Sequence, residues 1–415
     1  MKAFDSADRQ LAGELFEQVR SLSAARLGVT RPSYSEAESA AMKVIEDAAR
    51  SVGLSMRRDA AANLVVEHPP GKEKAVWMGS HLDSVPEGGN YDGLAGVVAG
   101  LLCLIKGKQT GLGKPLALIG LRGEESAWFG KPYLGSYALF GRLTPQDLER
   151  RQRDSGRPLA EHMRECGAQV DRIAAGERLV DPRSIGAWLE LHIEQGPIMV
   201  AREVPVGVVT GIRGVLRHIS AHCRGSAGHS GAVPRWLRQD AVFALAELLT
   251  RLDENWQALN ARGVDLVVTS GVVATDPREH SPSRIPGDVR FSLEIRSQSL
   301  ETITAFHRLA LAEAAAIEKA RGVRFDFGER VLSEPALIDG EWAARLKKGC
   351  AALRVPCIDI PSGAGHDAAI FSNEGVPAAM MFVRNDKGSH NPEEKMDLDD
   401  FMMGVEVLYQ AVAQA

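Results

Sequence analysis

The first half of the chain alternates between amphipathic stretches and short runs that are almost wholly apolar. Residues 7–22 and 34–52 have the apolar spacing of helices, and Ser33 or Ser35 is suited to cap the second. The apolar runs 75–79, 116–121 and 188–193 predict buried strands, and residues 93–105 predict a helix after the first strand. Apolar strands joined by helices are typical of an α/β fold with a largely parallel sheet.

The pattern changes near residue 213. Strand-like alternation over 215–222 and 289–296 is interleaved with helical spacing over 240–252 and 300–320, and residues 323–331 predict one further strand. These elements predict a compact α+β insert, residues 213–331. The α/β pattern then resumes with helices over 341–353 and 398–413 and a strand over 378–383. We therefore expect a discontinuous main domain, 1–212 with 332–415, that is interrupted by the insert.

Composition narrows the class of protein. A chain of 415 residues exceeds what one hydrophobic core usually serves, which agrees with two domains. The net charge of −5 predicts neither a nucleic-acid nor a membrane-surface partner, and the longest apolar run, 94–105, is too short to cross a bilayer. The five cysteines are scattered and odd in number, and the chain turns polar at its start. We expect no disulfide framework, no signal peptide and a cytoplasmic location.

Histidine and acidic residues follow the ends of two predicted strands. His81, Asp83 and Asp92 come after the first strand, and Glu124 and Glu125 come after the second. In open α/β sheets the crevice beyond the carboxyl ends of the strands binds ligands. Imidazole nitrogen and carboxylate oxygen are the ligands of a borderline metal. The sequence therefore predicts a metal-dependent enzyme.

The spacing of these residues indicates different roles. His81 and Asp83 are two residues apart, so on a strand they share a side, and Asp83 can accept the second ring N–H of a metal-bound His81. Asp92 could bridge two metals with its two oxygens. Of the adjacent Glu124 and Glu125, one can bind metal while the other takes a proton from water.

Each of these residues also has a simpler interpretation. A histidine near a strand is often structural, a Glu-Glu pair usually lies on the surface, and Asp92 could cap a helix. The metal-site interpretation is preferred because all three groups follow strand ends.

Further motifs carry a resemblance to a known family. They are Gly79-Ser80-His81-Leu82-Asp83, His192-Ile193-Glu194-Gln195-Gly196-Pro197, residues 225–229, Gly363-Ala364-Gly365-His366-Asp367-Ala368 and residues 389–394. Together they resemble the di-metal aminoacylase and carboxypeptidase superfamily. Within it they are most similar to the ureido-hydrolysing branch of N-carbamoyl-L-amino-acid amidohydrolases, beta-ureidopropionase and allantoate amidohydrolase. The resemblance covers nearly the whole chain and implies that the insert is a lid and dimerisation domain.

The resemblance also implies a set of metal ligands. One metal would be held by His81, Asp92 and His192, and a second by Asp92, Glu125 and His390, with Asp92 bridging. Glu124 would be the general base. Three protein ligands per ion leave a position open for catalysis, and zinc, manganese, cobalt and nickel all suit such ligands.

The substrate side is implied in the same way. His229 matches a histidine that polarises the scissile carbonyl from across a homodimer interface, and Arg296 matches an arginine that binds the substrate carboxylate. Gln195 matches a substrate contact, and Gly363 and Gly365 border the pocket. Taken alone, His229 would be a loop histidine and Arg296 a surface charge.

The chain departs from the family in its lid. Ser283 stands where a substrate-contacting asparagine is usual, with Arg284 beside it. Gly228 replaces an asparagine before the lid histidine, and Glu294 replaces an aspartate. None of these positions belongs to the implied metal set, so they bear on which substrate is bound.

Three hypotheses about function follow. The first is an amidohydrolase that cleaves a linear C–N amide bond, the ureido group of an N-carbamoyl-L-amino acid or of an allantoate-like acid. The second is an aminoacylase or dipeptidase, although such relatives commonly have an acidic residue in place of His192. The third is an inactive binding or scaffold protein, which the retention of every implied ligand disfavours.

Overall fold

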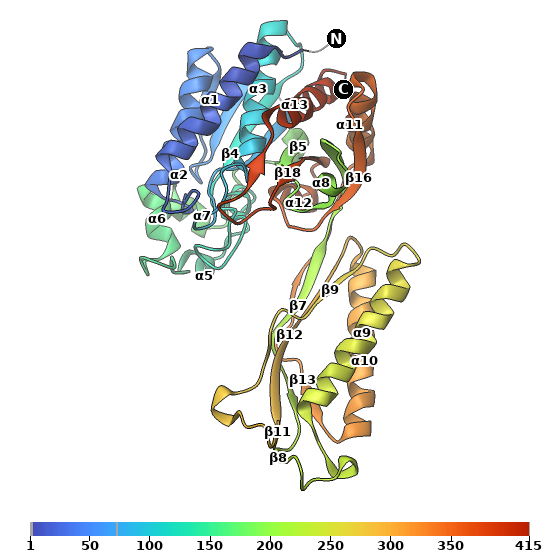
Figure 1. The fold of residues 1–415 in the computed structure, drawn as a ribbon. Helices are drawn as coiled ribbons and strands as arrows, with labels where there is room; N and C mark the ends of the chain where they lie inside the picture. Colours follow the sequence, from blue (N-terminus) through green and yellow to red (C-terminus); the bar gives the residue numbers. More distant parts are fainter. Residues whose placement is uncertain (1–2, 72–73, 415) are drawn as a thin grey trace. The chain divides into compact units, whose positions relative to one another are not determined.

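The structure, a computed structural model, describes residues 3–71 and 74–414. Their contacts divide the chain into two compact units. Unit 1 contains the residues up to Thr210 and from Leu337 onward, and unit 2 is Gly211–Ala336 (Figure 1). The segment predicted as an insert falls within unit 2.

The described part of unit 1 is built on a nine-stranded sheet in the order β1-β2-β4-β3-β5-β17-β6-β15, with β16 beside β6. The strands are β1 (Ser55–Arg58), β2 (Leu64–His68), β3 (Ala75–His81), β4 (Leu116–Leu121), β5 (Ile185–Ile193), β6 (Val206–Ile212), β15 (Ala336–Leu337), β16 (Cys357–Ser362) and β17 (Ala378–Val383), and β18 (Asn385–Asp386) pairs separately with β19 (Lys395–Met396). The strands β4, β3, β5 and β17 are parallel, whereas β1, β2 and β6 pair in antiparallel fashion. The predicted α/β fold with a mainly parallel sheet is confirmed for these central strands.

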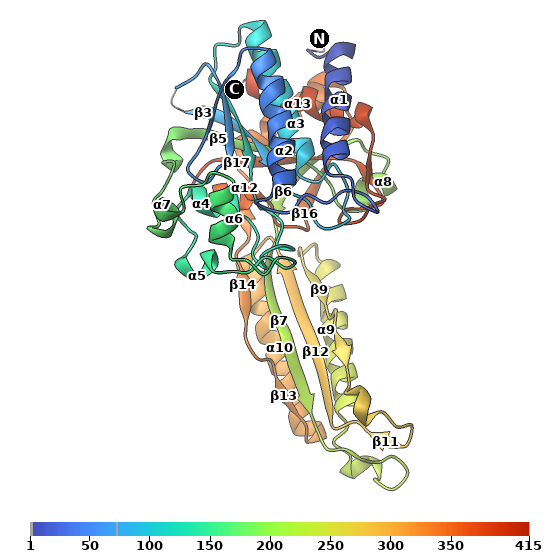
Figure 2. The same ribbon diagram turned by 90° about the vertical axis from the view of Figure 1, so that its left-hand side faces the viewer.

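Helices cover both faces of this sheet. They are α1 (Ser6–Leu22), α2 (Glu36–Ser51), α3 (Leu94–Thr110), α4 (Leu134–Leu139), α5 (Pro145–Leu148), α6 (Leu159–Glu165), α7 (Val170–Ala174), α8 (Ile198–Ala201), α11 (Gly340–Leu353), α12 (Asp367–Asn373) and α13 (Leu398–Ala413). Figure 2 shows α1, α2 and α3 side by side, and with α11 and α13 they share one apolar core that includes Leu189 and Leu191 of β5. The alternate residue Trp188 points to the other face, where it stacks on Phe371 of α12 with 4.0 Å between ring centroids.

Local sequence explains where the helices begin and end. Ser35 caps α2 by accepting a hydrogen bond from Glu38 N–H, so this helix begins at Glu36, two residues later than predicted. In α3, residues Leu94 to Ile105 are all buried, which agrees with the apolar run predicted there. Gly111 ends α3 with a positive φ of 65°.

Unit 2 has an α+β fold in which two helices pack against a sheet. Its main sheet has the order β10-β12-β7-β13, with β14 beside β7 and β9 beside β12. The elements are β7 (Gly214–Arg224), β8 (Gly228–His229), α9 (Ala241–Asn260), β9 (Val267–Thr269), β10 (Val273–Ala274), β11 (Arg284–Ile285), β12 (Asp288–Ser297), α10 (Leu300–Arg321), β13 (Arg324–Asp326) and β14 (Val331–Ser333). The two helices and the sheet enclose a core of their own.

The single strand predicted over 323–331 is wrong. Two short strands, β13 and β14, pair there with different parts of β7. Gly328 between them has a φ of +61°, and its N–H donates to Asp326 Oδ1 at 3.1 Å. This turn interrupts the extended backbone, and the apolar pattern on either side of it does not reveal the break.

None of the helices in the described residues has the length and apolar character needed to span a bilayer.

Candidate metal centre and active site

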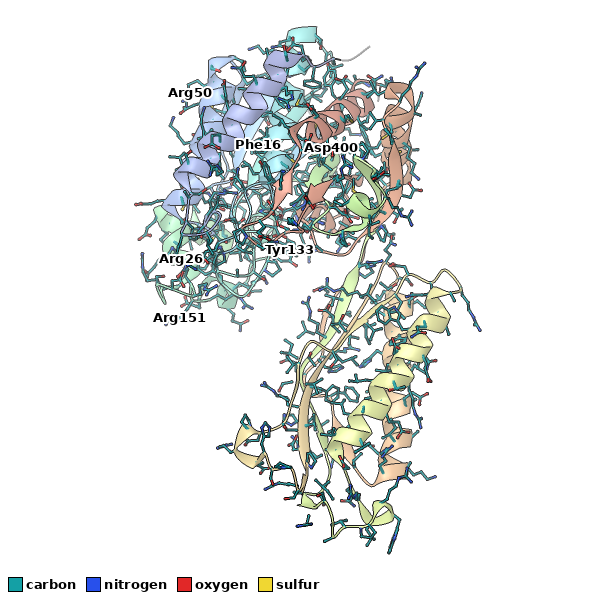
Figure 3. The ribbon with its side chains drawn as sticks, viewed as in Figure 1. Phe16, Arg26, Arg50, Tyr133, Arg151 and Asp400 are labelled. Atoms are coloured by element: carbon teal, nitrogen blue, oxygen red, sulfur yellow. The ribbon has the colours of Figure 1, made fainter. Side chains whose placement is uncertain are left out.

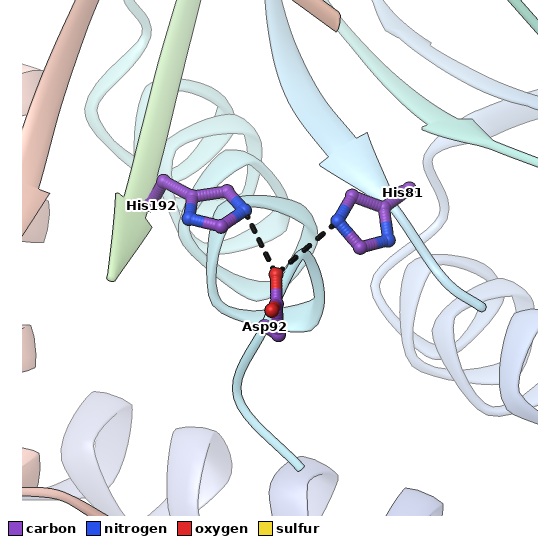
Figure 4. Close-up of side chains that lie close together, drawn as sticks. All are labelled: His81, Asp92 and His192. Atoms are coloured by element: carbon purple, nitrogen blue, oxygen red, sulfur yellow. Dashed lines mark ion pairs between the residues drawn. The ribbon is translucent and has the colours of Figure 1, made fainter. Parts of the chain in front are cut away.

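Two histidines from strand ends meet a loop aspartate in unit 1. His81 is the last residue of β3, His192 lies next to the end of β5, and Asp92 comes two residues before α3. His81 Nε2 lies 3.4 Å and His192 Nε2 lies 3.2 Å from the same oxygen, Asp92 Oδ1 (Figure 4). All three side chains are buried. Parallel pairing places both strand ends at one edge, which is why residues so distant in sequence converge.

The second oxygen of Asp92 faces another group of potential ligands. His390 Nε2 lies 3.4 Å from Asp92 Oδ2 and 3.2 Å from Glu125 Oε1. Within each group, His81-Asp92-His192 and Asp92-Glu125-His390, one ligand atom per residue lies within 4.8 Å of the others. Asp92 is therefore shared by two three-residue groups.

The donor atoms around Asp92 fit a cation. Asp92 Oδ1 is buried and has no hydrogen-bond partner among the described residues, an arrangement that is costly unless a positive charge satisfies it. His192 Nδ1 lies 3.0 Å from the Ile193 carbonyl, and Gly93 N–H donates to His192 Nε2 at 3.3 Å. These contacts assign the ring proton to Nδ1 and leave Nε2, the nitrogen nearer Asp92, as the acceptor.

Asp83 organises the surroundings of His81. Its Oδ1 lies 3.3 Å from His81 Nδ1 and accepts the Glu124 N–H at 3.0 Å, while its Oδ2 accepts the Glu125 N–H at 3.1 Å and the Ser33 hydroxyl at 2.5 Å. From the sequence we expected strand alternation to place Asp83 on the same side as His81. In the structure β3 ends at His81, so Asp83 lies outside the strand and alternation does not explain the contact. It reaches His81 from the following turn, where its backbone carbonyl also lies 3.1 Å from His81 Nδ1.

Glu124 is buried beside the first group without belonging to either. Its Oε2 lies 4.0 Å from His81 Nε2, and its carbonyl accepts the Tyr133 N–H at 3.0 Å. Burial raises the pKa of the Glu124 carboxyl well above its usual range, and the nearby Glu125 and Asp367 add to this although His81 opposes it. A carboxyl group with a raised pKa is suited to exchanging protons.

The charges in the two groups favour bound cations. Burial opposes ionisation of Asp92, but its contacts with His192, His390 and His81 outweigh burial and hold its pKa well below the ordinary value. Asp92 and Glu125 in turn raise the pKa of His390 to about 11. The acids therefore attract positive charge, which can be supplied by protons or by metal ions.

The loop that carries His390 contains two residues that sequence reasoning did not single out. Glu394 Oε1 accepts the backbone N–H groups of Tyr91 at 2.7 Å and Asp92 at 3.2 Å. The Ser389 hydroxyl lies 2.6 Å from Asp92 Oδ2 and 2.5 Å from Glu394 Oε2. Both residues lie in the quoted motif 389–394, so their proximity to His390 was the available signal.

Arg31 is a third residue that the sequence did not reveal. Its fully buried side chain donates from Nε to the Leu82 carbonyl at 2.8 Å and from Nη1 to Asn90 Oδ1 at 2.9 Å, and its N–H donates to Ser84 Oγ at 3.0 Å. These bonds hold the loop between His81 and Asp92.

Of the three predicted substrate contacts in unit 1, Gln195 lies at Asp92 and Gly365 lies beside Tyr133. Gln195 has a φ of +62°, and its Nε2 donates to Asp92 Oδ2 at 2.7 Å. Gly363 and Gly365 lie in the loop between β16 and α12, and Gly365 packs against the hydroxyl of Tyr133.

The predicted lid residues lie in unit 2. Ser283 and His229 are brought together, because β8 pairs with β11 so that Arg284 faces His229, and the Ser230 N–H donates to the Ser283 carbonyl at 2.8 Å. Arg296 lies near the opposite end of β12, where it pairs with Val215 of β7. Its Nε is 2.6 Å from Glu294 Oε1, so the unusual Glu294 forms an ion pair with it.

Comparison with known proteins agrees with this geometry. The profile of peptidase family M20/M25/M40 matches residues 77–414. The chain belongs to this family. M20 enzymes are di-metal hydrolases, and the two ligand groups around Asp92 are consistent with that chemistry. The predicted enzyme class, a hydrolase of carbon–nitrogen amide bonds, is confirmed.

Several relatives within the M20 family have names that describe the hydrolysis of ureido compounds. An N-carbamoyl-L-amino acid amidohydrolase of Geobacillus stearothermophilus is 34% identical, and the match covers 93% of each chain. An allantoate amidohydrolase of Escherichia coli is 30% identical over 92% of this chain and 91% of its own. The structure of a hydantoinase/carbamoylase family amidase from Burkholderia ambifaria has a TM-score of 0.82 and 29% identity, covering 98% of this chain and 96% of that one. The resemblance read from the motifs is confirmed.

Proposed function

We propose that this M20 chain is a two-metal amidohydrolase that cleaves the ureido group of an N-carbamoyl-L-amino acid or of a related, allantoate-like ureido acid. The observation that carries the proposal is the Asp92 carboxylate, whose two oxygens face two separate ligand groups. The names of the relatives from Geobacillus and Escherichia support the ureido substrate.

In this proposal His81, Asp92 and His192 hold one divalent cation, and Asp92, Glu125 and His390 hold the other. Nitrogen and oxygen donors suit zinc, manganese, cobalt or nickel. When bound, the cations polarise the substrate carbonyl and acidify the attacking water. Asp83 keeps the His81 ring oriented through its contact with Nδ1.

Glu124 moves the proton. It takes a proton from the water that attacks the ureido carbon, and it returns this proton to the amino-acid nitrogen as the C–N bond breaks. The other product, carbamic acid, breaks down to CO2 and ammonia. The burial of Glu124 and its place outside both ligand groups support this role.

We propose the substrate contacts that the family resemblance implies. Gln195, Ser283 and the loop at Gly363 and Gly365 contact the substrate, and Arg296 pairs with its carboxylate. His229, contributed across a homodimer interface, stabilises the developing oxyanion. The dimer and a cytoplasmic location stay predictions.

A substrate panel tests the proposal. The metal-loaded protein is expected to release ammonia from N-carbamoyl-L-amino acids or allantoate, and to release amine from N-acetyl amino acids and dipeptides far more slowly. Amine release that exceeds ammonia release would identify an aminoacylase or dipeptidase. Failure to hydrolyse any compound in the panel with both metals bound would point to an inactive homologue.

A further inference from the structure

Tyr133 is held between the proposed base and the glycine loop. It has a left-handed φ of +61° directly before α4, and its N–H donates to the Glu124 carbonyl at 3.0 Å. A Cβ atom built on Gly365 would lie 1.8 Å from Tyr133 Oη, so the phenolic oxygen rests on the Gly365 backbone and only glycine leaves it room. Figure 3 labels Tyr133 among the packed side chains of unit 1.

The hydroxyl of Tyr133 has no hydrogen-bond partner within the described chain. Two other tyrosines of unit 1 are paired, since Tyr34 donates to the Ala61 carbonyl at 3.2 Å and Tyr409 lies 2.7 Å from the Thr110 hydroxyl. Tyr133 is only partly buried, and its hydroxyl oxygen is not among the buried, unpaired polar atoms of the described residues. An unpaired hydroxyl at this place is therefore available to a ligand.

The surroundings of Tyr133 keep its phenol protonated. Burial, followed by the nearby Glu124 and Asp367, raises the pKa of the Tyr133 phenol well above its usual value, so it stays protonated. Asp367 Oδ2 is itself buried without a partner among the described residues. A protonated phenol keeps lone pairs on Oη that can accept a hydrogen bond.

We propose that the Tyr133 hydroxyl accepts a hydrogen bond from the terminal amino group of the ureido substrate, and thereby selects carbamoyl over formyl and acyl substrates. This inference rests on the proposed function. The ureido carbon bears an oxygen, which bound cations would polarise, and a nitrogen that leaves, which must lie at Glu124 to receive its proton. In this proposal the terminal NH2, the third group, faces Tyr133, whose backbone N–H donates to the Glu124 carbonyl and whose hydroxyl packs against Gly365. A formyl hydrogen or an acetyl methyl group donates no hydrogen bond there and leaves Oη unpaired.

The test is the preference of the Tyr133→Phe variant between the N-carbamoyl and N-formyl forms of one amino acid. The ratio of the two kcat/KM values is expected to fall about tenfold, because only the carbamoyl substrate loses a hydrogen bond. If turnover of the N-formyl compound is too slow to measure, the inhibition constant of that compound is used in place of its kcat/KM. Tyr137→Phe is the matched control, since Tyr137 packs edge-on against Tyr133 with 5.9 Å between ring centroids and also belongs to the segment at α4. It should leave the ratio unchanged.

Gly365→Ala provides an independent check, because the added methyl group must displace the Tyr133 hydroxyl. We expect a similar fall in the ratio, and a smaller further fall when the substitution is combined with Tyr133→Phe. An unchanged ratio in Tyr133→Phe, or equal losses on both substrates, would overturn the assignment while wild-type ammonia release still upheld the proposed function. Absence of wild-type ammonia release would overturn both.

Discussion

Replacing Glu124 by glutamine is expected to remove nearly all hydrolytic activity while both metals stay bound. The amide has nearly the same shape as the carboxylate but cannot accept the proton of the attacking water. Glu124 belongs to neither ligand group, so its replacement should leave the metal content unchanged. General-base catalysis contributes about 10²–10⁴-fold, and we expect a loss of about a thousandfold in kcat. Ammonia release and elemental analysis of the purified variant measure the two effects.

Glu149→Gln serves as the matched control for this substitution, because Glu149 is exposed in unit 1 and should leave both readings at the wild-type level. Turnover of Glu124→Gln within a few-fold of wild type would remove Glu124 from its role. Loss of metal from this variant would instead make Glu124 a ligand.

Replacing Asp92 by asparagine is expected to have the largest effect on metal binding. The two oxygens of Asp92 face different ligand groups, and an amide offers only one oxygen with no negative charge. Both sites should weaken together, so the metal content should fall from about two ions to less than one per chain, with loss of turnover. Elemental analysis after gel filtration measures the content.

Asp154→Asn, at an exposed position, is the control for the same change of charge. If Asp92→Asn kept one ion at full occupancy, Asp92 would be a ligand of a single site. Retention of both ions with normal turnover would contradict the bridging arrangement altogether.

The central parts of unit 1 were predictable because their pattern is local. The apolar runs that became β3, β4, β5 and β17 stand out from their neighbours, and parallel pairing then places His81 and Glu124 near one edge of the sheet. The strands β1, β2, β6 and β16 did not stand out in the sequence, and all four lie to either side of the central parallel strands.

The residues that support the site were less predictable, because their roles depend on contacts between distant segments. In the sequence, Arg31 resembles any other loop arginine. Only the folded chain brings it into hydrogen-bonding contact with the loop that carries Asp92. The role proposed for Tyr133 depends on its contact with Gly365, which is more than two hundred residues away in the sequence. Local spacing in the sequence contains no information about such contacts between distant residues.

The most direct test of a two-metal ureidohydrolase is a metal titration of the stripped protein, followed by the rate of ammonia release from an N-carbamoyl-L-amino acid. The account predicts negligible activity without metal and a rise that levels off at about two equivalents per chain. Full activity in the stripped protein, or a plateau at about one equivalent, would contradict it.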